Sequence, residues 1–331
     1  MDNNNASRTF SKEFIISFTF IFSTTLLLVL LENILVIVAI LSSRELRNVR
    51  SNLFLVGLSV ADVFTSLTLI PFQLVQLWSS PNWPLGDIGV KIYNSSWNFC
   101  MIVPFLTVLA ITLDRYLGIT RPQHYCVSND QVATRGRGVV VGLVFIWTYT
   151  VVWVSLLSLS FTDPPQNEYA WNVPYKYYYP YLGINVLVLL IIICYCYLKL
   201  LHFVKRTREE VSDILGASVD FSVSLGSSQS LADHQAQTEI KFTKTVGYII
   251  IALVVVWIPV ICLEIVYAFG NVGSWRKDRY KLEIVGIISL WLVCSNGIIN
   301  PVIYLFRSKR IRRVIKSLLK CKLKIENNVS Y

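Results

Sequence analysis

Seven long apolar stretches separated by short polar segments divide this chain of 331 residues. A helix needs about 20 mainly apolar residues to cross a bilayer, and only helices or closed barrels satisfy the backbone in lipid. The stretches are too long and too unalternating for barrel strands. The pattern therefore predicts an all-α membrane protein, a seven-transmembrane helix bundle, with spans at 14–41, 52–78, 88–118, 138–161, 178–204, 240–268 and 282–305.

Polar segments flank and interrupt this bundle of residues 14–305. Residues 1–13 form a polar N-terminal segment in which Asn5 begins a glycosylation sequon, Asn-Ala-Ser. The Ser-rich connection at about 205–238 is expected to be flexible. It is either a phosphorylated segment or a passive linker.

The C-terminal segment, 306–331, predicts a short amphipathic eighth helix followed by a tail. Apolar residues recur there at helical spacing opposite a basic face, which suits a helix lying on the anionic inner leaflet. Those positions are Ile311, Val314, Ile315, Leu318 and Leu319. Cys321 follows them and is either a palmitoylation site or a free thiol.

Composition and charge agree with a membrane protein. Charged residues make up 15% of the chain, against about 25% in soluble domains. The net charge of +10 does not indicate nucleic-acid binding, because the basic residues lie between spans and in the tail rather than on a soluble scaffold. Basic loops mark the cytoplasmic side. Their distribution predicts an extracellular N-terminus and a cytoplasmic C-terminus.

Ionisable and amide side chains inside the spans are costly in lipid and are functional candidates by default. Asp62 in the second span is expected to face the bundle interior and to hydrogen-bond with water or with the asparagines. Those asparagines are Asn33, Asn296 and Asn300. The same cluster also fits a purely structural polar clamp. The sequence assigns no role to Glu32 in the first span.

The third span ends in Asp114-Arg115-Tyr116. Arg115 can pair with the adjacent Asp114, and Glu239 at the start of the sixth span could reach it across the bundle. Such a pair would hold the third and sixth spans together until a conformational change breaks it. Alone, the tripeptide also fits an ordinary helix end with snorkelling charges.

Two spans contain prolines that predict hinges. Trp257 precedes Pro259 by two residues in the sixth span, and Pro301 lies in the seventh, in Asn-Pro-Val-Ile-Tyr ending at Tyr304. Proline removes a helical hydrogen bond and kinks the helix. An indole beside a kink can couple the filling of a pocket to a swing of the helix.

Taken together, these residues resemble the class A, or rhodopsin-like, G-protein-coupled receptors, and most nearly their small-molecule, amine-type members. The resemblance runs from Asn33 to the helix after the seventh span. The matched residues are Asn33, Asn52, Asp62, Asp114, Arg115, Tyr116, Trp147, Trp257, Pro259, Asn300, Pro301 and Tyr304. Tyr197 looks like the family tyrosine that meets Tyr304 in the active state, and Glu239 like the family's acidic partner of Arg115.

The resemblance implies a receptor of the plasma membrane. An extracellular small-molecule or peptide ligand would bias a two-state bundle. The sixth span would swing outward, Arg115 would be freed, and a heterotrimeric G protein would dock and release GDP. Membrane lipid and arrestin are the other implied partners. Nucleic acid, cofactor and enzymatic reaction are not expected.

The sequence departs from the family at its outer half. Val90 stands where a cysteine usually forms a disulfide with the loop at about 162–177, which also lacks cysteine, so no disulfide is predicted. Trp97 stands where amine receptors have an aspartate, and Cys294 where opsins have a lysine. Neither an amine receptor nor an opsin is therefore supported.

The family's sodium site and its proline in the fifth span are also incomplete. Asp62 and Asn296 match the sodium site, but Pro104 and Gly297 replace its two serines, so no metal is predicted. Leu189 stands where the fifth span usually has proline.

A ligand pocket is expected between the outer halves of the spans. Its candidate residues are Gln73, Trp97, Asn98, Met101, Tyr181, Asn185 and Glu264. Glu264 lies about 10 Å above Trp257 along the helix and could pair with a cationic ligand group, with Trp97 adding cation–π attraction. Alternatively, Glu264 points to outer water and Trp97 packs against the seventh span.

Three other functions compete with the receptor. A transporter or channel needs a chain of charged pathway residues, which Asp62 and Glu32 alone do not make. An intramembrane metal hydrolase is not supported, because the three histidines are scattered. A non-signalling, receptor-like protein is disfavoured by the presence of Arg115, Tyr197 and Tyr304.

Overall fold

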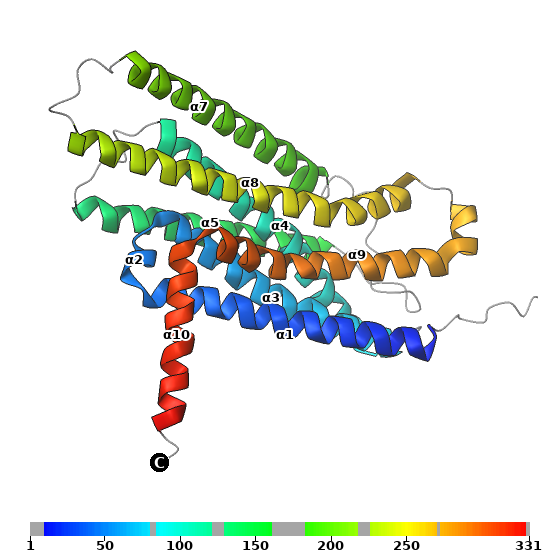
Figure 1. Cartoon of the computed structure of the whole chain (residues 1–331). Helices are drawn as coiled ribbons and strands as arrows, with labels where there is room; N and C mark the ends of the chain where they lie inside the picture. Colours follow the sequence, from blue (N-terminus) through cyan, green and yellow to red (C-terminus); the bar gives the residue numbers. More distant parts are fainter. Residues whose placement is uncertain are drawn as a thin grey trace, which may run out of the picture.

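The structure, a computed structural model, describes residues 10–79, 84–120, 129–160, 183–217, 226–269 and 272–328, and every long element in these ranges is a helix. Seven helices are long and apolar enough to cross a membrane. They run side by side as a bundle (Figure 1), which confirms the predicted architecture. They are α1 (Lys12–Ser42), α3 (Arg50–Ser79), α4 (Gly86–Thr120), α5 (Asn129–Ser160), α7 (Leu189–Ala217), α8 (Gly226–Phe269) and α9 (Val272–Arg307).

Four helices extend further into polar sequence than predicted, among them α9, which begins at Val272 rather than at 282. α5 begins at Asn129, and the connection predicted as flexible at about 205–238 is helical over 205–217 and 226–238. Residues 218–225 lie outside the described ranges. The extensions contain no proline, and that of α7 is rich in the good helix formers Arg, Glu and Leu. Hydropathy therefore indicates where lipid contact ends rather than where the helix ends.

The start of α1 is fixed by a cap and by aromatic packing. The Ser11 hydroxyl accepts a hydrogen bond from the Phe14 backbone N–H at 3.2 Å. The Phe10 ring stacks on Phe14, with 4.9 Å between centroids, and lies 5.6 Å from the ring of Tyr280 in α9. Phe18 extends the stack one turn further, 4.5 Å from Phe14. This ladder holds the first turns of α1 against α9.

α4 has the largest buried share of the spanning helices. It packs against α3, α5, α7 and α8, while α1 packs against α3 and α9. Large apolar side chains on the outside of α1, α5 and α7, including Phe20, Phe145 and Ile191, are exposed. An apolar exterior of this kind suits a bundle whose surroundings are hydrocarbon.

Glycines allow three of these helix pairs to approach closely, namely α1 with α9, α3 with α9 and α3 with α5. A Cβ on Gly297 of α9 would lie 2.9 Å from Val29 Cγ1 of α1 and 3.3 Å from Asp62 Cβ of α3. A Cβ on Gly57 of α3 would lie 2.6 Å from Leu143 Cδ2 of α5. Helices in lipid associate largely through such close packing at small residues.

The fifth span begins irregularly even though it lacks the family's proline. A π-helical segment, η2 (Gly183–Val188), ends directly before Leu189, where α7 begins. Wide π-helical turns often occur at functional sites, because they redirect the side chains around them. The other irregular positions are prolines inside continuous helices: Pro71, Pro104, Pro259 and Pro301.

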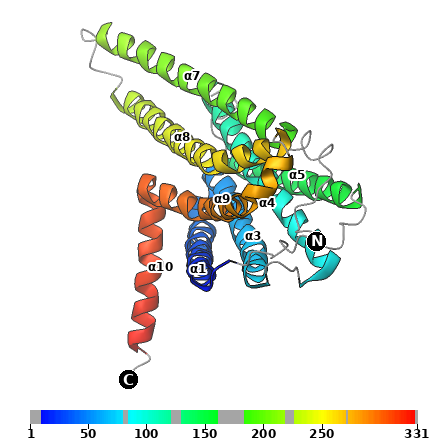
Figure 2. The same cartoon turned by 90° about the vertical axis from the view of Figure 1, so that its right-hand side faces the viewer.

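The predicted amphipathic helix is present as α10 (Lys309–Asn328) and runs across the direction of the spanning helices (Figures 1 and 2). Its first turns pack on the bundle, since Ile311 and Ile315 belong to the core. Further along, Leu319 is 46% exposed. Arg310 Nε lies 3.4 Å from Glu45 Oε1 of the short helix α2 (Arg44–Arg47), an exposed pair of small energetic value. The apolar face of α10 is thus partly covered by protein.

Substitution of Gly297 by Ala should separate α1 from α9. The added methyl group would overlap Val29, and overpacking of this kind costs about 1–3 kcal/mol of folding free energy. The matched control is Gly142→Ala in α5, where a Cβ would meet nothing within 4 Å. Thermal unfolding of the purified chain should show a lower midpoint for Gly297→Ala only. Equal midpoints for the two variants would contradict the close approach.

Candidate functional site

Buried polar side chains join α1, α3 and α9 in the middle of the bundle. Asn300 Nδ2 donates a hydrogen bond to Asp62 Oδ2 at 3.0 Å. Asn33 Nδ2 donates to the backbone oxygen of Gly297 at 2.8 Å and to that of Val29 at 2.9 Å. Polar groups buried in a membrane bundle are costly unless they bond to one another. The structure thus brings Asn33, Asp62 and Asn300 into one cluster.

The cluster continues along α9 and α3 through further buried polar atoms. Asn296 and Tyr304 lie one turn before and one turn after Asn300, and both are buried. Among the described residues, no partner is found for Asn33 Oδ1, Ser59 Oγ, Asn296 Oδ1, Asn300 Oδ1 or Tyr304 Oη. Groups of this polarity and burial commonly bind internal water. The polar region therefore extends from Asp62 toward the end of the bundle that carries α10.

Arg115 and Asp114 form a buried ion pair in α4. Arg115 Nε donates to Asp114 Oδ2 at 3.2 Å, and a second guanidinium nitrogen contacts the same oxygen. Arg115 is 7% exposed and Asp114 5%. Glu239 belongs to α8, but its side chain lies outside the described residues, so its pair with Arg115 stays a prediction. A buried guanidinium depends on its partner, since losing that partner leaves an uncompensated charge.

Tyr197 of α7 is seated on α8. Its hydroxyl donates to the Thr243 backbone oxygen at 3.4 Å. The Tyr197 ring lies against Gly247. A Cβ added at Gly247 would overlap the Tyr197 hydroxyl and lie 2.7 Å from the ring carbon Cζ. Sequence analysis missed Gly247, because the need for a small residue depends on a ring from another helix. Tyr304 is buried in α9, and its hydroxyl makes no hydrogen bond to Tyr197 or to any other described residue.

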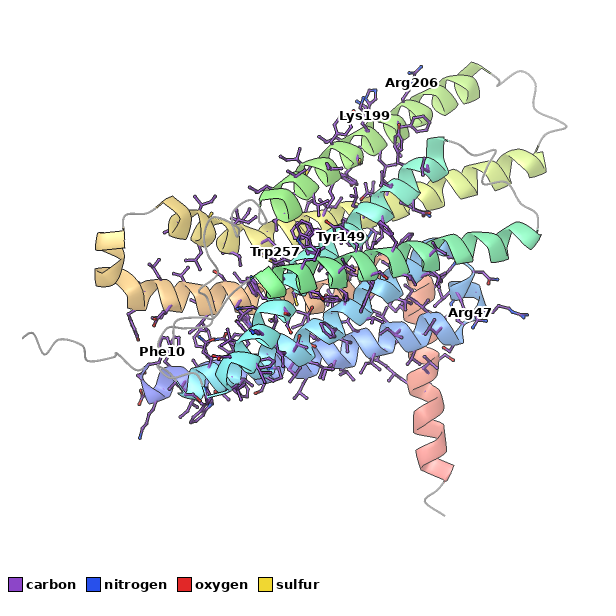
Figure 3. All side chains as sticks on the ribbon, turned by 180° about the vertical axis from the view of Figure 1, so that it is seen from behind. Phe10, Arg47, Tyr149, Lys199, Arg206 and Trp257 are labelled. Carbon is purple, nitrogen blue, oxygen red and sulfur yellow. The ribbon has the colours of Figure 1, made fainter. Side chains whose placement is uncertain are left out.

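Trp257 is buried inside the bundle (Figure 3), two residues before Pro259 in α8. Its ring lies 6.3 Å from that of Trp97 and 5.4 Å from that of Phe105, both on α4. These separations are typical of attractive aromatic pairs. Trp97 therefore packs on the sixth spanning helix, and its packing against the seventh stays a prediction. Phe105 was not singled out from the sequence.

Four of the predicted ligand contacts are buried side chains of α3 and α4, namely Gln73, Trp97, Asn98 and Met101. Gln73 Oε1 accepts a hydrogen bond from Tyr93 at 3.5 Å, and Asn98 Nδ2 donates to the Asn94 backbone oxygen at 2.8 Å. The other three contacts lie outside the described side chains: Tyr181, Asn185 and Glu264. The hydrogen bond of Gln73 to Tyr93 joins α3 to α4 at this level, and the ligand pocket itself stays a prediction.

A cation–π contact that sequence analysis missed joins α8 to α9. The Arg307 guanidinium lies 5.4 Å from the centroid of the Tyr248 ring. Both side chains are exposed, at the end of the bundle that carries α10. At exposed sites such a contact contributes about 0.5–1 kcal/mol. Tyr248 directly follows Gly247, the residue against which Tyr197 lies.

The remaining predictions concern cysteines, metals and modification. Five described cysteines are free: Cys100, Cys194, Cys196, Cys262 and Cys294. The Cys100 thiol donates to Thr65 Oγ1 at 2.9 Å. The described residues contain no group of three His, Cys, Asp or Glu that could hold a metal. Asn5 and the Cys321 side chain lie outside the described residues.

Comparisons with known proteins also indicate a seven-helix membrane protein over most of the chain. Residues 32–304 match the family model described as 7 transmembrane receptor (rhodopsin family). The histamine H2 receptor of Rattus norvegicus is 24% identical over 319 residues, covering 95% of this chain and 82% of that receptor. Galanin receptor 2b of Danio rerio is 24% identical, covering 91% and 74%. The octopamine receptor beta-2R of Chilo suppressalis is 24% identical, covering 89% and 77%.

Substitution of Asn300 by Leu should destabilise the fold by about 1–3 kcal/mol, because it leaves the Asp62 carboxyl buried without its donor. In an Asp62→Leu background the same substitution should cost much less, since no acid remains to be satisfied. Thermal unfolding of the four purified variants measures this coupling. Equal losses in the two backgrounds would show that the side chains are not coupled.

Proposed function

We propose a signalling mechanism on the premise that this chain belongs to the rhodopsin family of seven-transmembrane receptors, whose family model matches residues 32–304. The chain is a G-protein-coupled receptor that spans the plasma membrane several times. Its partners are a heterotrimeric G protein and an extracellular ligand. Nothing in its relatives favours the transporter or channel that the sequence left as an alternative.

We propose that the N-terminus is extracellular and that the end of the bundle carrying α10 is cytoplasmic. The support is charge, since basic residues gather on α2, on the end of α7 and along α10. Lys199 and Arg206, for example, lie on the outside of α7 (Figure 3). In this orientation Asn5 is available for glycosylation, and Cys321 and the basic face of α10 meet the inner leaflet. Arrestin would share the cytoplasmic face with the G protein.

The observation that carries the mechanism is the buried pair of Arg115 and Asp114. A guanidinium held in this way cannot bind a G protein, which would have to reach it from the cytoplasm. We propose that a G protein gains access to Arg115 when α8 moves away from α4, against which it packs. Activation is thus a shift between two arrangements of the bundle. The outward swing of α8 exposes Arg115 to the G protein.

Two ring contacts oppose this swing near the cytoplasmic end of α8. Tyr197 of α7 lies against Gly247, and Arg307 of α9 lies over the Tyr248 ring. An outward movement of α8 would separate both pairs. Tyr197 would then be free to turn toward Tyr304, whose buried hydroxyl has no partner among the described residues.

The ligand would act on α8 through Trp97. Trp97 is a predicted ligand contact, and its ring meets that of Trp257, two residues before Pro259. A ligand that displaces Trp97 therefore displaces Trp257 and favours the swing. Two relatives are named for histamine and octopamine, both small amines. We propose a small polar ligand whose cationic group pairs with Glu264, in place of the aspartate that is replaced here by Trp97.

Substitution of Arg115 by Ala should abolish G-protein activation at unchanged surface expression, because the group that engages the G protein is gone. Asp114→Asn should raise ligand-independent activation, since it weakens the hold on Arg115. Arg47→Ala, an exposed arginine at the same end of the bundle, is the matched control. G-protein activation sensors in cells expressing each variant measure the outcome. Full activity of Arg115→Ala would contradict the mechanism.

Substitution of Tyr248 by Leu should raise ligand-independent activation about two- to fivefold, because it removes a contact of about 0.5–1 kcal/mol that holds α8 to α9. Tyr248→Phe keeps the ring face and should leave this activity unchanged. Arg307→Gln in the Tyr248→Leu background should add little, since the contact is already lost. The same sensors give the readout. An identical rise in Tyr248→Phe would mean that the hydroxyl, rather than the ring, restrains α8.

A further inference from the structure

The outward side of α7 carries basic side chains inside the membrane that the signalling mechanism does not use. The apolar span of this helix is Val186–Arg206, and it has the smallest buried share of the seven. Its 21 residues are about 31 Å long, which matches the hydrocarbon thickness of about 30 Å. Arg206 therefore lies at one boundary of the hydrocarbon, and Lys199, seven residues earlier, lies about 10 Å inside it.

Three exposed side chains follow one another along this side of the helix: Lys199, His202 and Arg206, which we call the α7 basic stripe. Their spacing of three and four residues places them on one face. Figure 3 shows Lys199 and Arg206 on the outside of α7. Their neighbours Leu198 and Tyr195 are 64% and 61% exposed. The stripe thus faces lipid from the hydrocarbon boundary inward.

Lys199 is the member of the stripe that is costly to hold in lipid. Its ammonium lies 5.7 Å from the centroid of the Tyr195 ring, and it makes no ion pair or hydrogen bond with a described residue. Side chains lean toward the N-terminal end of their helix, which from Lys199 is toward the middle of the membrane. Tyr195 lies one turn further in that direction, so the ammonium is not extended to the aqueous boundary. A cation at this depth is expensive until an acceptor binds to it.

The composition of the stripe limits what can bind to it. Each member can donate hydrogen bonds, and residues 186–206 include no Asp or Glu. The partner is therefore a negatively charged acceptor. A phospholipid phosphate meets this requirement, because it lies at the level of Arg206 and can descend past His202 toward Lys199. An acid on a helix of another membrane protein would satisfy Lys199 alone and would leave no use for the donors that continue to the boundary.

We propose that the α7 basic stripe binds phosphatidic acid, with the phosphate held between Lys199 and His202, below the usual level of the head groups. The N–H groups of the ammonium donate to phosphate oxygens. Arg206 and the adjacent Lys205 attract the anionic lipid at the boundary. The exposed side chain of Leu198 meets the acyl chains. Binding of this kind depends on α7 spanning the membrane and not on how the receptor signals.

Phosphatidic acid fits the stripe better than other anionic phospholipids for two reasons. Its negative charge is on the phosphate itself, which is the group that can descend. It also has no further polar head group, so none has to be drawn from water into the hydrocarbon when the phosphate reaches Lys199.

The test uses the purified full chain in phosphatidylcholine vesicles that contain a trace of a photoreactive lipid, with a diazirine in one acyl chain. The lipid is either phosphatidic acid or phosphatidylcholine. After illumination, peptide mass spectrometry locates the labelled residues. Phosphatidic acid should label α7 beside the stripe about tenfold more than phosphatidylcholine does, because only the former carries the net charge that the stripe attracts.

Three variants locate the site. Lys199→Leu should weaken the labelling of α7 by phosphatidic acid about fivefold, which is the contribution of one basic residue near charged lipid. Lys199→Arg keeps the charge and the donors and should be labelled like the wild type. Lys244→Leu removes an exposed lysine of α8 at the same end of the bundle, so it is the matched control for net charge and should change nothing.

Contrary results overturn the proposal. Equal labelling of α7 by the two lipids in the wild type excludes a site for phosphatidic acid and leaves Lys199 to a protein partner. Equal losses in Lys199→Leu and Lys244→Leu mean that net charge, rather than the stripe, attracts the lipid. A loss in Lys199→Arg as large as in Lys199→Leu excludes recognition of charge. An unchanged midpoint of thermal unfolding is the folding control for each variant, and the comparison of the two lipids needs no variant.

Discussion

Inside a membrane bundle, a buried polar group must be satisfied by the protein or by internal water, because hydrocarbon offers no hydrogen bonds. This constraint ties α1, α3 and α9 together through two side-chain amides. Asn300 bonds to Asp62, and Asn33 bonds to the backbone of Gly297. Each hydrogen bond keeps its length and angle, and so stabilises the fold fully, only if the helices hold one separation and one rotation. The polar cluster therefore fixes the separation and rotation of α1, α3 and α9 in the middle of the bundle.

Small residues make that geometry accessible. Apolar side chains gain little by leaving lipid for protein, so helices must associate through close packing. Gly297 lets α1 and α3 approach α9 at the polar cluster, and Gly57 lets α3 approach α5. Gly247 serves a different purpose, since it accommodates the ring of Tyr197 rather than a helix backbone. The same residue type thus stabilises the fixed half of the bundle and seats a side chain in the half proposed to move.

Much of the fold could be predicted from sequence because lipid imposes a simple rule on length and hydropathy. The seven spans and the amphipathic α10 follow from that rule, and so does the bond between Asp62 and Asn300. Helix ends were missed where polar helix formers continue past the lipid, as at 205–217. The contacts of Trp97 with Trp257 and of Arg307 with Tyr248 were missed for another reason. They depend on the rotation of one helix against another, which neither helix encodes alone.

If a ligand acts through the pair of Trp97 and Trp257, its affinity and its efficacy depend on different contacts. In the proposed mechanism, polar groups such as Asn98 would hold a ligand without moving either indole ring. Only the part of a ligand that pushes on Trp97 does mechanical work on α8. Affinity and efficacy would then be set by different atoms of the same molecule. A compound trimmed at the end that meets Trp97 would remain bound as an antagonist, while one enlarged there would gain efficacy without gaining affinity.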